Sequence, residues 1–69
     1  MEYNIQLYKE GKLQKTLTQD VYMLEPDGKM LLLDVSSFYD ELRLFDGDHR
    51  YIVTYKYITT FQGKAVFKR

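Results

Sequence analysis

Five residues that could bind a metal ion or move protons lie within ten positions of one another. They are Asp40, Glu41, Asp46, Asp48 and His49. The spacing does not match a calcium-binding loop, and a single histidine gives none of the paired spacings of zinc or nickel sites. Acidic residues beside Gly47 are also typical of tight turns, so we favour a solvated turn here.

The same residues offer little for catalysis. Neighbouring carboxylates such as Asp40 and Glu41 would point to opposite faces of a strand. Ser36 and Ser37 have one histidine in the whole chain to serve as a base, and neither a nucleophile elbow nor a glycine-rich phosphate loop is present. We therefore expect no enzyme and no cofactor, with a divalent metal ion left open.

Length and composition indicate one small folded domain spanning residues 1–69. The chain has no cysteine, so oligomerisation is the means left to stabilise so small a core. Ten basic and ten acidic residues cancel, which argues against non-specific nucleic-acid binding. No apolar run is long enough to span a membrane, and the first residues do not resemble a signal peptide. We expect a cytoplasmic protein with no membrane contact.

The four glycines predict tight turns between antiparallel strands, because each follows an acidic or amide residue and separates two apolar runs. The expected strands are 3–9, 13–18, 20–25, 30–33, 42–45, 51–61 and 64–68. Leu13 and Leu17 should both face the core. Ser36 to Glu41 resembles a capping box and predicts about one turn of helix. The fold class is all-β, a small antiparallel barrel of SH3-like or Sm-like size with six or seven short strands.

The longest expected strand runs from Tyr51 to Phe61 and carries only one charge, on Lys56. Strict alternation places Tyr51, Val53, Tyr55, Tyr57, Thr59 and Phe61 on one face. Such a strand must be covered on both edges and both faces, so we expect a homodimer. We expect its aromatic residues to lie in the core, in a dimer interface or in an interface with a partner. These residues are Tyr51, Tyr55, Tyr57 and Phe61. A stacking platform for single-stranded nucleic acid is the less favoured alternative.

The run NIQLYKEGKLQKTLTQDVYMLEPDGKMLLLD, residues 4–34, resembles the CooT-like proteins. That family shares the order of a strand, a charged glycine turn, a strand, an acidic residue with valine, a Pro-acidic-Gly turn and an apolar strand. The later half agrees more loosely, through Phe38 to Glu41 and through 64–68. The resemblance implies a small homodimeric barrel linked to nickel handling, and many members are labelled as predicted RNA-binding proteins.

The resemblance also implies a metal site at the N-terminus. The family binds nickel through a cysteine directly after the initiator methionine, and this chain has Glu2 there. Met1 and Glu2 still offer an amine and a carboxylate, and His49 offers an imidazole.

Three functions therefore stand side by side. The first is a non-enzymatic, homodimeric binding or regulatory protein that engages a protein partner. The second is a carrier of a divalent, nickel-type metal ion that uses either the N-terminus, with Met1 and Glu2, or the acidic stretch with His49. The third is a single-strand nucleic-acid binder that uses the tyrosines of 51–61.

Overall fold

The computed structural model describes residues 2–23 and 28–69, and these residues contain seven β-strands. The strands are β1 (Tyr3–Lys9), β2 (Lys12–Gln19), β3 (Tyr22–Met23), β4 (Met30–Leu33), β5 (Glu41–Phe45), β6 (Tyr51–Phe61) and β7 (Lys64–Lys68). The expected boundaries are therefore confirmed to within a residue or two, except that β3 is shorter. Leu24 and Glu25 of the expected third strand lie outside the described residues. The helical turn expected from Ser36 to Glu41 is wrong, because this segment forms an isolated turn that leads into β5.

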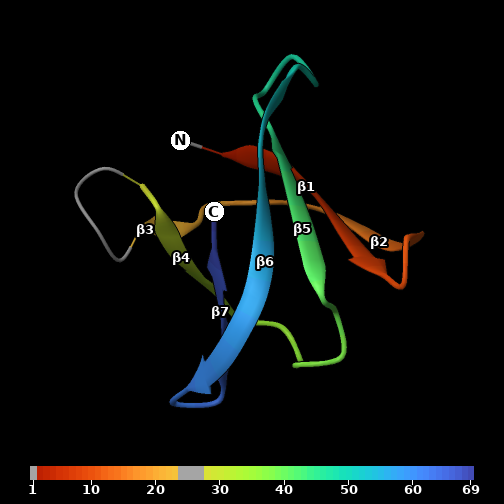
Figure 1. Cartoon of the computed structure of the whole chain (residues 1–69). Coiled ribbons are helices and arrows are strands. Elements are labelled where there is room, and N and C mark those ends of the chain that lie inside the picture. The colour runs from red at the N-terminus through yellow and green to blue at the C-terminus, as the bar shows by residue number, and fades with distance from the viewer. Residues whose placement is uncertain (1, 24–27) are drawn as a thin grey trace.

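All seven strands belong to one antiparallel sheet with the order β2-β1-β5-β6-β7-β4-β3 (Figure 1). The prediction of a small all-β fold of six or seven short antiparallel strands is confirmed. The sheet remains open, since β2 and β3 form its two ends and no pairing joins them within the described residues.

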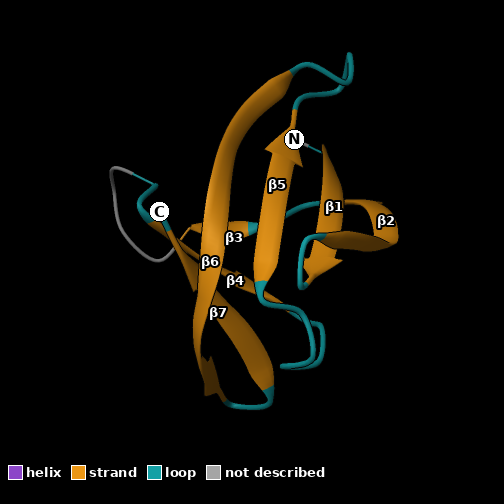
Figure 2. Cartoon of the chain, turned by 45° about the vertical axis from the view of Figure 1, so that its right-hand side comes forward, coloured by secondary structure: helices purple, strands orange, loops and turns teal. Residues whose placement is uncertain are grey.

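β6 holds the two halves of the sheet together. Its first half, Tyr51 to Lys56, pairs with β5, and its second half, Lys56 to Phe61, pairs with β7. Lys56 lies where the neighbours overlap and pairs with both Glu41 and Lys68. Figure 2 shows β6 bending along its length, so that the sheet curves around this strand. β5 and β7 therefore lie on either side of β6.

The curved sheet encloses one hydrophobic core. Its members come from both halves: Ile5, Leu7, Leu42 and Leu44 from β1 and β5, Leu31, Leu33, Ala65 and Phe67 from β4 and β7, and Tyr55 from β6. Each of them is at most 2% exposed. Because alternate residues of a strand point to opposite faces, the other residues of these strands form an outer face.

Two hairpin turns have the backbone that the sequence predicts. Glu10 and Gly11 have φ values of 52° and 78°, and Gln62 and Gly63 have values of 51° and 79°. Positive φ at both central residues defines the type I′ turn, whose twist matches that of the flanking strands. The positions of β2 and β7 beside their partners follow from these turns.

The loop between β5 and β6 is longer and is organised by Asp46. Asp46 Oδ1 accepts hydrogen bonds from the amides of Asp48 and Arg50, at 2.8 and 2.9 Å. The Asp46 carbonyl accepts from the His49 amide at 3.0 Å, and His49 has a positive φ of 63°. The hydrogen bonds from the Arg50 and Asp48 amides to the carboxylate lower the pKa of Asp46. Turn chemistry is therefore what Asp46 does here, as the sequence indicated.

Three β-bulges change which face a side chain occupies. Ile52, Ile58 and Gln14 are each the extra residue in a register shift. Each extra residue reverses the alternation beyond it. Leu13 consequently pairs with Tyr8 and is 50% exposed, so the expectation that it faces the core is wrong. Leu17 does pack against the core, as expected.

The backbone at His49 generates a testable prediction. Because a residue other than glycine is strained at positive φ, His49→Gly should raise the free energy of unfolding by about 0.5–1 kcal/mol. Urea denaturation measures the change. Gly63→Ala is the matched control and should lower stability by about 1 kcal/mol, since its φ of 79° strains any side chain. A loss of stability in His49→Gly as large as that in Gly63→Ala would contradict the account.

Candidate functional site on the outer face of the central strands

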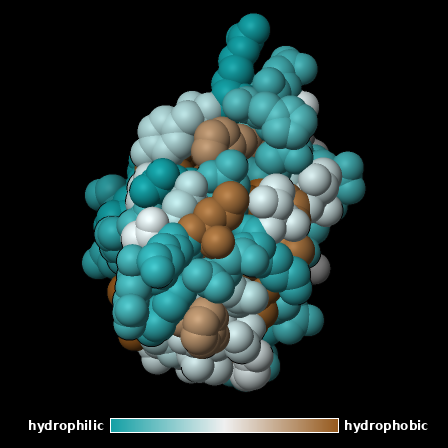
Figure 3. Space-filling view, turned by 90° about the vertical axis from the view of Figure 1, so that its right-hand side faces the viewer, coloured by the Kyte–Doolittle hydropathy of each residue, from teal (hydrophilic) through white to brown (hydrophobic). Residues whose placement is uncertain are grey.

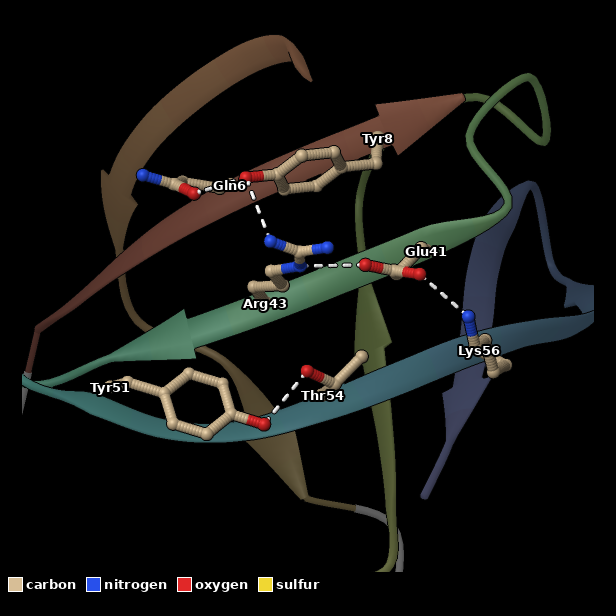
Figure 4. A network of polar contacts seen from close by, with 7 residues as sticks. All are labelled: Gln6, Tyr8, Glu41, Arg43, Tyr51, Thr54 and Lys56. Atoms are coloured by element: carbon tan, nitrogen blue, oxygen red, sulfur yellow. Dashed lines mark hydrogen bonds and ion pairs between the residues drawn. The ribbon is translucent and has the colours of Figure 1, made fainter. Parts of the chain in front are cut away.

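The outer face of β1, β5 and β6 carries a network of charged side chains centred on Glu41 (Figure 4). Glu41 Oε2 accepts from Arg43 Nε at 2.6 Å, and Glu41 Oε1 accepts from Lys56 Nζ at 2.6 Å. The Glu41 side chain is only 14% exposed, whereas those of Arg43 and Lys56 are 41% and 65% exposed. One shielded carboxylate thus holds two cations at the surface.

Arg43 is held from a second side by Tyr8. Its guanidinium carbon lies 4.0 Å from the centre of the Tyr8 ring, and its Nη1 donates to the Tyr8 hydroxyl at 3.3 Å. The Tyr8 hydroxyl in turn donates to Gln6 Oε1 at 2.7 Å. A stacked and hydrogen-bonded guanidinium loses less side-chain entropy when it binds a further group. The side-chain conformation of Arg43 is therefore fixed before a partner binds.

The network shifts the pKa of both Glu41 and Arg43. Hydrogen bonds from Lys56 and then Arg43 lower the pKa of Glu41 below its ordinary value of 4.5. The hydrogen bond to Glu41 raises the pKa of Arg43 above its ordinary value. Glu41 consequently stays ionised to lower pH than an isolated glutamate.

Strand register extends this network into a row across four strands. Tyr8 pairs with Glu41, Glu41 with Lys56, and Lys56 with Lys68. Lys68 is exposed and makes no ion pair with the other described residues. Arg43 lies two residues along β5 from Glu41 and pairs with Gln6 and Thr54, so it stands beside this row. We call Arg43, Lys56 and Lys68 the cation row. Arg43 and Lys56 share the charge of one carboxylate, and Lys68 adds a third cation.

The sequence predicted that the four aromatic residues of β6 share one face of the strand. That prediction is wrong, because the structure divides them between two faces. Tyr55 is 2% exposed, and its hydroxyl donates to the Gly28 carbonyl at 2.6 Å. Tyr57 is half-buried and packs edge to face on Phe67, with centroids 6.0 Å apart. Both belong to the core side of β6, as the core interpretation expected.

Tyr51 and Phe61 lie beyond the bulges and are 59% and 55% exposed. Tyr51 pairs with Phe45, packs against its ring at 5.9 Å and shares a hydrogen bond with Thr54 Oγ1 at 2.8 Å. These contacts place Tyr51 on the outer face beside Arg43 (Figure 4). A single tyrosine platform along 51–61 therefore does not form.

Most of the exposed apolar side chains gather on β6. Within the described residues, six large hydrophobic side chains are about half exposed, and four of them lie on this strand. The four, which we call the β6 apolar set, are Tyr51, Ile52, Ile58 and Phe61. The two others, Leu13 on β2 and Phe38 in the turn before β5, lie elsewhere.

The structure describes only two of the three residues expected to bind a metal ion. Met1 lies outside the described residues, whereas Glu2 and His49 are both exposed. Asn4 pairs with Phe45, so Glu2 and the 46–50 loop occur at the same end of the sheet. Among the described residues, no three His, Asp or Glu side chains gather as metal ligands would. The metal site stays a prediction.

No pocket or cavity is found in the part of the chain that the structure describes. Residues 2–23 and 28–69 also include no helix long and apolar enough to cross a membrane.

No protein-family model, no curated protein and no solved structure matches this chain. The resemblance to the CooT-like proteins stays a prediction.

Sequence reasoning did not identify the Tyr8, Glu41, Arg43 and Lys56 network. Its signal was the alternation of β1 and β5, which places Gln6, Tyr8, Glu41 and Arg43 on wet faces. The pairing of β1 with β5 was needed to bring these side chains together, and it joins segments 35 residues apart.

The division of the tyrosines predicts opposite results for two substitutions. Tyr55→Ser should lower the free energy of unfolding by about 3–5 kcal/mol, because it empties part of the core and removes the hydrogen bond to Gly28. Tyr51→Ser should cost about 1 kcal/mol or less, because the ring is exposed. Urea denaturation of the two variants compares them directly. Equal losses would contradict the placement of these residues on different faces.

The lowered pKa of Glu41 predicts how stability changes with pH. Because its folded pKa lies below the unfolded value of 4.5, the Glu41 contribution is present above pH 4.5 and is lost as pH falls through the folded pKa. Wild type should therefore be more stable than Glu41→Gln at neutral pH, and the gap should close in acid. Urea midpoints from about pH 7 to about pH 3 test this. Glu10→Gln controls for the loss of one charge, and a gap that widens in acid would refute the assignment.

Proposed function

We propose that this chain is a non-enzymatic binding protein that engages a protein partner through the outer side of β6. The observation that carries the proposal is the concentration of exposed apolar side chains on this one strand, the β6 apolar set. Grouped exposed apolar residues are typical of interaction surfaces, whereas single ones are common on any protein. Here they form two groups, Tyr51 with Ile52 at the start of β6 and Ile58 with Phe61 toward its end.

The backbone beneath this surface is rigid enough to support binding. β6 is paired with β5 along its first half and with β7, on the opposite edge, along its second half, and Tyr55 anchors its other face in the core. A surface on a fixed strand loses little conformational entropy when a partner docks. The β6 apolar set is therefore better suited to recognition than the exposed Leu13 on the edge strand β2.

The surrounding surface is mixed in character. Figure 3 shows the side of the molecule that lies to the right in Figure 1 as mainly hydrophilic, with small separate hydrophobic areas. Tyr8, Arg43 and Tyr51 lie on the outer face of β1, β5 and β6. Tyrosine and arginine are enriched in interfaces that form and separate, and such interfaces are no more apolar than the rest of the surface. This composition supports reversible binding.

We also propose that a second copy of the chain can occupy the same surface, which would make the protein a homodimer. Ile52, Ile58 and Phe61 are each about half exposed, so packing them against a twin would remove apolar area from water. A chain of 69 residues gains stability from such association. A cytoplasmic location and a regulatory role stay predictions.

Loss of partner capture tests the proposal. The double variant Ile52→Ser with Ile58→Ser should lose the proteins that the wild-type chain captures from host extract, because it removes two apolar members of the β6 set. The control Leu13→Ser with Phe38→Ser removes two equally exposed apolar side chains away from β6 and should capture them as wild type does. Equal capture by both double variants, each checked for folding by circular dichroism, would refute the proposal.

Sedimentation equilibrium tests the homodimer. The wild-type chain should show a mass above the 8.3 kDa of one chain as concentration rises, and the β6 double variant should stay at 8.3 kDa. A wild-type mass fixed at 8.3 kDa at high concentration would rule out self-association through β6.

A further inference from the structure

We propose that the cation row on β5, β6 and β7 binds acidic side chains in an extended segment of a partner protein, with Arg43 as the anchor. The inference rests on the proposed function and names the chemistry of the partner. Three observations support it. Contacts with Glu41 and Tyr8 hold Arg43 in place, the cation row has more positive than negative charge, and other acidic residues lie at the ends of the strands.

Arg43 has donors left after its own contacts are counted. Nε bonds to Glu41 and Nη1 bonds to the Tyr8 hydroxyl, while Nη2 makes no hydrogen bond to the described residues. A guanidinium carries five N–H groups, and its planar fork binds a carboxylate through two of them. With 41% of the side chain exposed, these remaining donors can reach a second carboxylate from outside.

The charge balance of this surface also favours an anionic ligand. Arg43, Lys56 and Lys68 face one carboxylate, Glu41, whose two oxygens are already occupied. The chain as a whole has no net charge, so its acidic groups must lie elsewhere. Four of them, Glu10, Asp40, Asp46 and Asp48, occupy the segments at the ends of the strands.

The size of the row suits a short acidic run. Arg43 lies two strands from Lys68 and is offset from its row by two residues, so at about 4.8 Å per strand and about 3.3 Å per residue the two are about 12 Å apart. An extended chain covers this distance in about four steps. Acidic side chains at the first and fifth positions share one face of that chain and would then meet Arg43 and Lys68.

Two other occupants fit this surface less well. A second copy bound through the apolar side chains of β6 would bring cations and not anions to the row, so it would not neutralise the row. A long polyanion such as single-stranded nucleic acid would extend past the row onto a chain that has no net positive charge to hold it. An acidic protein segment avoids both costs.

Fluorescence anisotropy with two labelled probes tests the inference. The first probe is a hexapeptide of alternating glutamate and tyrosine, and the second is the same peptide with glutamine in place of glutamate. The glutamate peptide should bind the wild-type chain, and its affinity should fall with added salt. Failure to bind, or equal binding of the glutamine peptide, would overturn the inference. Binding of labelled oligothymidylate in preference to the glutamate peptide would overturn it in favour of nucleic acid.

Three single substitutions locate the binding. Arg43→Gln should weaken the glutamate peptide about tenfold, since it removes a charge-assisted hydrogen bond. Lys68→Gln should weaken it about threefold, and it disturbs no ion pair of the described residues. Lys15→Gln removes an exposed lysine of β2 and should leave the affinity unchanged. Equal affinity of Lys68→Gln and Lys15→Gln would overturn the assignment even if Arg43→Gln fails to fold.

This experiment can fail separately from the proposed function. If the glutamate peptide does not bind while the β6 double variant still loses its captured partner, the acidic segment is wrong and the β6 surface stands. If capture does not depend on Ile52 and Ile58, the proposed function itself is wrong.

Discussion

The backbone hydrogen bonds of β6 place the strictest constraint on this fold, because an eleven-residue strand needs a paired neighbour along its whole length. β5 and β7 have five residues each, so neither can pair with all of β6 alone. The chain meets the constraint by pairing the first half of β6 with β5 along one edge and the second half with β7 along the other. The bend of β6, the single core enclosed by both halves and the central position of Lys56 all follow from this division.

The bulges at Ile52 and Ile58 link this constraint to the surface. Each adds one residue to β6 where its partner strand has none, and each reverses the alternation beyond it. Tyr55 and Tyr57 therefore remain with the core, while Tyr51 and Phe61 are exposed. Bulges commonly aim a side chain toward a function rather than toward packing. Here they give one strand both a buried anchor and an exposed apolar set.

The sequence predicted the parts of the fold that depend on local chemistry. Strand limits such as 51–61 and 64–68 follow from apolar runs bounded by turn residues, and the turns at Gly11 and Gly63 follow from the need for positive φ. The face occupied by Leu13 or Tyr51 could not be predicted, because a bulge depends on how two strands fit together and leaves no clear residue signature. The contact between Tyr8 and Arg43 likewise depends on the pairing of β1 with β5, which brings together segments far apart in the chain. Tyr51 and Phe61, expected among the interface residues, are exposed, whereas the polar network around Arg43 was not predicted.

The central claim is that β6 buries one side and presents the other for binding. The chain has three isoleucines, of which Ile5 is fully buried and Ile52 and Ile58 are about half exposed. Methyl NMR of isoleucine-labelled protein therefore reports both sides of the claim with three signals. On concentration, or on addition of a captured partner, the signals of Ile52 and Ile58 should shift while that of Ile5 stays fixed. Signals of Ile52 and Ile58 that stay unchanged under both conditions would contradict the account.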